Sequence, residues 1–242
     1  MTETLSLRAK IEQSPMGAYQ WMIVAMAAIM NLLDGFDVLA LAFTATAIQN
    51  EFGLTRIELG YLLSAGLFGM TAGSLFLAPL ADKIGRRPLL LMAVSLSAIG
   101  MLGSAFISQY QWLGFWRVIT GLGVGGILVG TNVITSEYSS RKWRSFAISV
   151  YAAGFGIGAV LGGMFAVMLQ GEYGWRSVFL AGAILTGLLL VVLFIWLPES
   201  IDFLTSKQPK NAEVRLNLIA KKIGLAGDWK LPEKVETVKS KL

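Results

Sequence analysis

Two acidic residues stand in the middle of a long apolar segment near the start of the chain. The segment reads Leu-Leu-Asp-Gly-Phe-Asp at 32–37, so Asp34 and Asp37 are three residues apart and follow Asn31. In a helix this spacing places both carboxyl groups on one face. Two neighbouring carboxylates in an apolar environment cannot both ionise cheaply, which favours exchange of a proton at one of them. The three polar residues form a candidate proton-coupling or substrate site; the alternative is that the acids only bridge neighbouring helices.

Arg117 lies several residues inside a later apolar segment, ahead of closely spaced glycines. A charged side chain in hydrocarbon is costly unless it faces a water-filled cavity or a counter-ion. Its candidate counter-ions are Asp34 and Asp37 of the first span. The alternative is that its long side chain reaches back to the nearer membrane surface.

A short polar stretch between two apolar segments contains charges in a defined order. An acid, a base, one spacer, a glycine and a basic pair follow one another as Asp82, Lys83, Ile84, Gly85, Arg86 and Arg87. Gly85 permits a tight turn, and Pro88 suits the first turn of the next helix. Asp82 can pair with cations at a helix end. A general excess of positive charge would explain the three basic residues but not the ordered acid and glycine.

The elements that must position these residues are membrane-spanning helices. Of the 242 residues, 55% are hydrophobic and 14% are charged, whereas soluble domains contain about 25% charged residues. Apolar stretches of about 20 residues, the length of helix that crosses a bilayer, recur along the chain. The sequence predicts an all-α membrane protein with six spans, near residues 20–47, 57–80, 89–107, 113–136, 146–169 and 177–197.

Three regions follow from these spans: a tail over 1–19, the six-helix bundle over 20–198, and a basic segment over 199–242. In the last region we expect a short helix that Asn211 caps and that ends near Ile223. Its ragged apolar stripe suits either the surface of an anionic membrane or a solvated linker.

Basic residues gather on one side of the predicted spans. That side carries Arg8, Lys10, Lys83, Arg86, Arg87, Arg141, Lys142 and Arg144, and the other side carries Arg56 and Arg176. Lys and Arg favour the cytoplasmic side, so we predict a multi-pass inner-membrane protein with both termini in the cytoplasm. We expect Glu137, at the same end, to join the charges of Arg141 and Arg144.

The fifth predicted span contains glycines at the spacing of a packing ridge: Gly154, Gly158, Gly162 and Gly163. Such a ridge lets two helices approach closely in a membrane. The chain has no Cys and no His, which argues against a zinc or haem site and, with no phosphate-binding loop, against an enzyme. We expect no metal and no cofactor other than a coupling proton. The net charge of +5 comes largely from the last segment and calls for no nucleic-acid partner.

These motifs together resemble the major facilitator superfamily and, within it, the aromatic acid:proton symporters that import benzoate, hydroxybenzoates or muconate. The resemblance rests on Asp-Gly-Phe-Asp at 34–37, on the charged stretch at 82–87 and on Arg117. It implies that Asp34 and Asp37 are required for transport, that the charged stretch forms a conformational gate, and that Arg117 takes part in proton coupling. Sugar or drug substrates remain open alternatives.

The same resemblance implies that the chain is the amino-terminal half of a twelve-helix carrier, with the second six-helix half absent. We therefore expect a complementary six-helix half or a homodimer partner, besides the lipid bilayer and a small organic acid. The alternative is a membrane protein that does not transport, either a truncated carrier or an assembly partner.

Overall fold

The computed structural model describes residues 6–225 and 227–231. The outermost parts of both predicted terminal segments, 1–5 and 232–242, lie outside the described residues. The described part is built from nine helices: α1 (Leu7–Gln13), α2 (Ala18–Phe52), α3 (Arg56–Ile84), α4 (Arg86–Ala105), α5 (Tyr110–Tyr138), α6 (Arg144–Tyr173), α7 (Trp175–Trp196), α8 (Ile201–Lys207) and α9 (Ala212–Ile223). The six helices α2 to α7 are long and apolar enough to cross a membrane. The prediction of an all-α membrane protein with six spans is confirmed.

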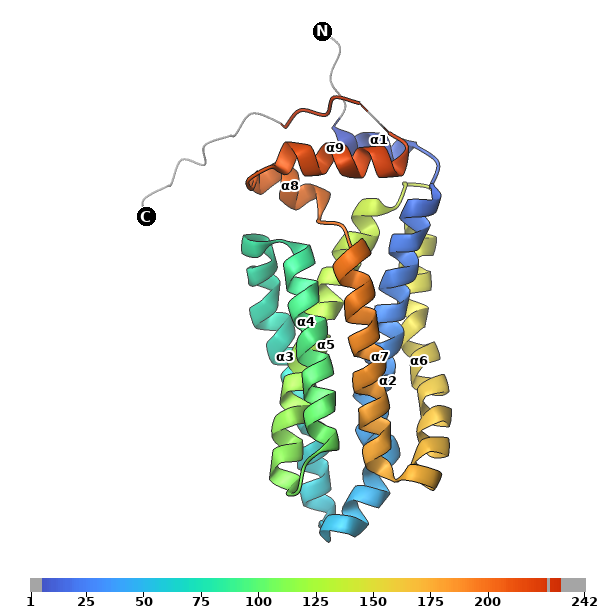
Figure 1. Cartoon of the computed structure of the whole chain (residues 1–242), viewed down its shortest axis with the longest axis vertical. Helices are drawn as coiled ribbons and strands as arrows, with labels where there is room; N and C mark the ends of the chain where they lie inside the picture. Colours follow the sequence, from blue (N-terminus) through green and yellow to red (C-terminus); the bar gives the residue numbers. More distant parts are fainter. Residues whose placement is uncertain (1–5, 226, 232–242) are drawn as a thin grey trace, which may run out of the picture.

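The long helices run side by side, and α1, α8 and α9 lie across one end of the bundle (Figure 1). Several helices extend beyond the apolar stretches that predicted them, because polar residues continue the helix past the hydrocarbon. The sharp return between α2 and α3 is set locally. Gly53 adopts a φ of +62°, and Thr55 and Glu58 form a capping box, with Glu58 Oε2 accepting from the backbone N–H of Thr55 at 2.8 Å.

Close contact between α2 and α6 depends on glycine. A Cβ atom at Gly154 would meet the carbonyl oxygen of Ala28 at 2.5 Å, and one at Gly158 would collide with the carbonyl oxygen of Leu32. The rings of Phe36 and Phe43 lie against Gly162 and Gly163, respectively. All four glycines of the predicted ridge therefore face α2, the helix that carries the two aspartates.

Replacing Gly158 by Ala is expected to destabilise the bundle, because the added methyl group has no space against the α2 backbone. Overpacking of this kind costs about 1–3 kcal/mol. Gly156→Ala is the matched control, since nothing lies within 4 Å of a Cβ at that position of the same helix. Unfolding in mixed detergent micelles measures both. Equal stability of the two variants would contradict the close packing of α6 against α2.

The helices at the end of the bundle are held by ion pairs. Arg8 of α1 pairs with Asp202 of α8, and Arg144 at the start of α6 lies 2.6 Å from Glu12 Oε1. The prediction that Glu137 joins Arg141 and Arg144 is wrong. Its two carboxylate oxygens instead accept from Ser200 Oγ and from the backbone N–H of Ile201, both at 2.8 Å. Glu137 thus satisfies the free donors at the start of α8.

The hydrogen bond from Arg144 holds the pKa of Glu12 below its ordinary value of 4.5. Since the folded-state pKa is lowered, the pair stabilises the fold above the ordinary pKa, and this contribution is lost as the pH falls through the lower folded value. Both side chains are partly exposed, so the effect is about 0.2–1 kcal/mol. We expect Glu12→Gln to weaken the loss of stability that occurs as the pH falls below the ordinary pKa of 4.5, measured as the free energy of unfolding in mixed micelles over a pH series.

Asn211 occupies the N-cap position of α9, as expected, but its side chain does not cap the helix. Asn211 stands before α9 with a φ of +63°, and its side chain makes no capping hydrogen bond.

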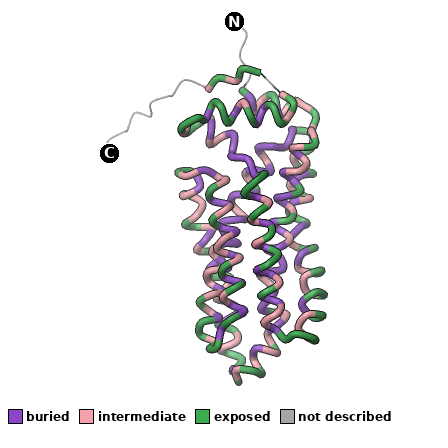
Figure 2. Tube along the Cα trace, in the orientation of Figure 1, coloured by how far each residue is buried: buried purple, intermediate pink, exposed green. Residues whose placement is uncertain are grey.

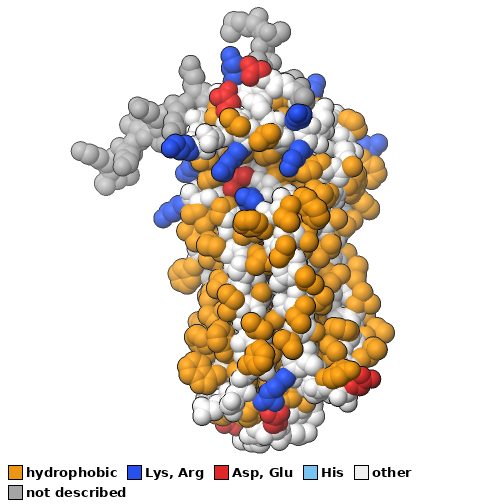
Figure 3. Space-filling view, in the orientation of Figure 1, with side chains coloured by type: hydrophobic (Ala, Val, Ile, Leu, Met, Phe, Trp, Pro, Cys, Tyr) orange, Lys and Arg blue, Asp and Glu red, His pale blue; other side chains and the backbone are white. Residues whose placement is uncertain are grey.

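Buried residues gather where the long helices face one another, and exposed ones follow their outer faces (Figure 2). Hydrophobic side chains cover those faces, as a protein surrounded by lipid requires (Figure 3).

Candidate functional site

Arg117 lies inside the bundle with only 3% of its surface exposed. Its guanidinium donates to Ser104 Oγ at 3.1 Å, to Thr120 Oγ1 at 2.9 Å and to Met101 Sδ at 2.9 Å. The ring of Phe179 lies 4.8 Å from its central carbon. The side chain therefore does not reach back to the membrane surface, and α4, α5 and α7 together hold it at depth.

Asp37 of α2 is the predicted acid that the structure brings to Arg117. Arg117 Nη1 donates to the backbone carbonyl of Asp37 at 3.3 Å, not to its carboxylate. Asp37 Oδ2 accepts from Ser97 Oγ at 2.6 Å, and Oδ1 is buried with no hydrogen-bond partner. One carboxylate oxygen is thus fixed, and the other is free to accept a proton.

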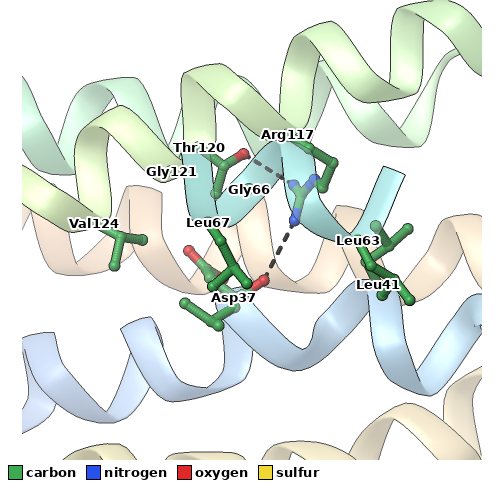
Figure 4. Close-up of a pocket in the computed structure, with 10 residues that line it drawn as sticks. Asp37, Leu41, Leu63, Gly66, Leu67, Arg117, Thr120, Gly121 and Val124 are labelled. Carbon is green, nitrogen blue, oxygen red and sulfur yellow. Dashed lines mark hydrogen bonds between the residues drawn. The ribbon is translucent and has the colours of Figure 1, made fainter. Parts of the chain in front are cut away.

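A small cavity of about 30 Å³ opens beside this pair and is lined by Asp37, Leu67, Arg117, Thr120 and Val124, among others (Figure 4). A water molecule needs a cavity of about 10–15 Å³ and two to four polar partners. The polar residues of its lining are Asp37, Arg117 and Thr120. Its volume therefore admits a water molecule and is far too small for an aromatic acid.

The other two residues of the predicted site lie apart from this cavity. Asp34 is 2% exposed, and its Oδ2 has no hydrogen-bond partner. Asn31 donates to the backbone carbonyl of Tyr151 at 2.8 Å and so ties α2 to α6. Between the acids, Gly35 lies so close to α6 that a Cβ would collide with the carbonyl of Phe155.

The charged stretch forms the junction of α3 and α4. Asp82 near the end of α3 and Arg86 at the start of α4 form an ion pair of 2.5 Å across this junction, while Lys83 is exposed. Gly85 turns the chain with a φ of +103°. The backbone N–H of Arg87 donates to Glu199 Oε1 at 3.0 Å, which fixes the junction to the segment after α7.

Sequence reasoning missed the hydroxyl and thioether partners of the site. Ser97 and Ser104 are seven residues apart in an apolar helix, a spacing that places both on one helical face and that could have signalled a polar lining. Thr120 follows Arg117 by three residues on the same face of α5. Met101 gave no signal, because a methionine in an apolar helix ordinarily packs against other apolar groups.

The family model of the Major Facilitator Superfamily matches residues 27–231. The chain belongs to the Major Facilitator Superfamily. This agrees with the resemblance found in the sequence, and it makes the chain part of a transporter family rather than an enzyme. Like other superfamily members, it is a multi-pass membrane protein.

Two relatives from Pseudomonas putida are similar to this chain. It is 35% identical to the 4-hydroxybenzoate transporter PcaK over 96% of this chain and 52% of the relative. It is 36% identical to a gallate transporter over 84% of this chain and 45% of the relative. The chain thus spans about half the length of these superfamily relatives.

Solved superfamily structures share the fold. The proton:xylose symporter XylE from E. coli, bound to 6-bromo-6-deoxy-D-glucose, superimposes with a TM-score of 0.76 at 22% identity. The match covers 87% of this chain and 50% of that protein. At this identity the likeness establishes the arrangement of the helices and nothing about the substrate.

Proposed function

We propose that this chain supplies the proton site of a carrier that imports an aromatic acid together with protons. The observation that carries the proposal is the buried Asp37 carboxylate, with one unpartnered oxygen, beside the buried Arg117. Isolated charges in hydrocarbon are expensive and mark ion or proton pathways. The similarity to the 4-hydroxybenzoate and gallate transporters supports an aromatic acid as the substrate.

Asp37 is the residue that takes up the proton, and Arg117 stabilises the carboxylate after the proton has left. Ser97 holds Oδ2 of this carboxylate in place, and Oδ1 has no hydrogen-bond partner. A water in the adjacent cavity would carry the proton to or from it. Asp34 and Asn31 support this region of α2 from outside the cavity.

The substrate requires more space than this half provides. We assign its binding volume to the space between this half and a second six-helix half, as in carriers whose two halves rock about a central site. On α3, aromatic and hydroxyl side chains that are all exposed share one face: Tyr61, Ser64, Phe68 and Thr71. They suit contact with a hydroxylated ring from the side that the partner half would close.

The ion pair of Asp82 and Arg86, at the junction of α3 and α4, belongs to the gate in this proposal. The excess of basic residues at the same end supports an orientation in the inner membrane with both termini in the cytoplasm. The junction contacts the segment after α7 through Arg87 and Glu199, so movement of one would move the other.

Uptake by proteoliposomes tests the proposal. The chain is reconstituted alone and together with the carboxy-terminal half of the 4-hydroxybenzoate transporter PcaK, with labelled 4-hydroxybenzoate outside. A monoanion that enters with one proton carries no net charge, so an inward gradient of one pH unit, about 1.36 kcal/mol, supports about tenfold accumulation. Each further proton would add a dependence on membrane potential of about 2.3 kcal/mol per 100 mV.

The expected result is accumulation that a protonophore abolishes, either with the added half or by the chain alone as a homodimer. Accumulation of labelled xylose in place of the acid would move the assignment to sugars. No accumulation in any arrangement, by chains that remain folded, would favour the reading as a membrane protein that does not transport.

A further inference from the structure

A pocket of about 260 Å³ lies where the end of α7 meets α9. Three cations line it: Arg87 of α4, and Arg215 and Lys222 of α9. Arg215 and Lys222 are seven residues apart, so they project from the same face of the helix. We call this site, together with Tyr19 and Glu199 in its wall, the basic pocket.

The positive charge of the basic pocket is largely uncompensated. Glu199 is its acidic residue, and Glu199 Oε1 already accepts from the backbone N–H groups of Arg87 and Ser200. In the described part of the chain, no acidic side chain forms an ion pair with Arg215 or Lys222. Arg87 Nε is buried without a hydrogen-bond partner. The pocket therefore offers donors and positive charge to an anion.

An apolar groove of about 660 Å³ begins directly beside the basic pocket. Leu91, Ser95 and Ile99 of α4 form one wall, and Leu190 and Phe194 of α7 form the other. Arg87 joins the two sites, because its Nη2 donates to the carbonyl of Phe194 at 2.6 Å and its guanidinium lies 5.8 Å from that ring. From Leu91 to Ile99 the groove follows α4 for about 12 Å at the usual rise of 1.5 Å per residue.

The position of this pair of sites matches a membrane leaflet. In Figures 1 and 3, α4 and α7 lie on the near side of the bundle, where hydrophobic side chains cover the long helices and Lys and Arg gather at the end near α8 and α9. The excess of basic residues assigns that end to the cytoplasm. The cytoplasmic leaflet holds anionic lipids, which basic side chains near its surface attract.

We propose that the basic pocket and the apolar groove together bind one anionic phospholipid of the cytoplasmic leaflet. The phosphate contacts Arg87, Arg215 and Lys222, and one acyl chain lies in the groove between α4 and α7. A free phosphate would use the cations but leave the groove without a role. A zwitterionic lipid would fill the groove but bring its own cation into the pocket.

Native mass spectrometry of the whole chain in detergent tests the site without any transport assay. Phosphatidylglycerol is titrated against phosphatidylcholine, and glycerol phosphate serves as a headgroup without chains. Phosphatidylglycerol is expected to bind with 1:1 stoichiometry and more tightly than either of the others. Arg215→Gln with Lys222→Gln is expected to weaken its binding by about fivefold for each cation removed.

Lys210→Gln with Lys221→Gln is the matched control, since it removes the same charge from the same region outside the basic pocket and should weaken binding less than twofold. Met92→Trp fills the groove and should weaken the binding of phosphatidylglycerol without changing the affinity for glycerol phosphate. Because Met92 is 41% exposed, the larger ring is tolerated in the fold. Equal binding of both lipids, or equal losses in the two double variants, would overturn the proposal. If glycerol phosphate bound as tightly as phosphatidylglycerol, the site would be one for a soluble anion and not for a lipid.

Discussion

Asp37→Asn is expected to abolish proton-driven accumulation of the acid while exchange of labelled for unlabelled substrate continues. Asparagine matches the size of aspartate and can still accept from Ser97 Oγ, which lies 2.6 Å from the carboxylate. It cannot take up or release a proton in the relevant range. The accumulation ratio under a gradient of one pH unit should therefore fall from about ten to one. Uptake and exchange by the same proteoliposomes, with the partner half present, provide the measurement.

Asp34→Asn is the informative comparison, because Asp34 is equally buried, lies one turn away and does not line the cavity beside Arg117. It should keep proton-driven accumulation. Loss of accumulation in Asp34→Asn, with normal accumulation in Asp37→Asn, would mean that Asp34 and not Asp37 carries the coupling proton. Ser97→Ala should give an intermediate result, since it frees the fixed oxygen of Asp37 without removing the carboxylate.

The sequence predicted those parts of the fold that depend on local chemistry. The six apolar stretches and the turn at Gly85 each need only neighbouring residues to form. The short helices α1 and α8 were not predicted, because each has seven residues, too few for a hydrophobic period to stand out. Their stability comes from contacts with the rest of the chain, such as Arg8 with Asp202.

Partners that are distant in sequence were beyond prediction. Glu137 was expected to pair with nearby arginines, yet it binds the start of α8, more than sixty residues away. Arg117 was expected to face a carboxylate, and it contacts the backbone of Asp37 together with polar side chains of α4 and α5. Burial explains the need for partners, but only the packing of the helices decides which ones are within reach.

Arg117→Met is expected to reduce uptake by at least about tenfold, which corresponds to the lower end of the roughly 1.5–3 kcal/mol contributed by a hydrogen bond to a charged group. Methionine is similar in length and fits an apolar site, so the loss would come from the missing charge. Without the cation, the carboxylate of Asp37 keeps its hydrogen bond from Ser97 but loses the nearby positive charge, so the carrier stays protonated. Arg117→Lys keeps a charge but cannot bridge Ser104 and Thr120 as the planar guanidinium does, and it should recover only part of the activity.

Arg117→Met also separates the effect on transport from the effect on stability. The hydroxyls that accept from Arg117 also donate within their own helices, Ser104 to the carbonyl of Gly100 at 2.7 Å and Thr120 to that of Trp116 at 3.0 Å. Removing the guanidinium therefore leaves no buried donor unpaired, and it relieves the cost of a desolvated charge. Arg117→Met should unfold in mixed micelles at the same or a higher denaturant fraction than the parent chain. If it unfolded much earlier, the arginine would hold the helices together, and its place in proton coupling would lose its support.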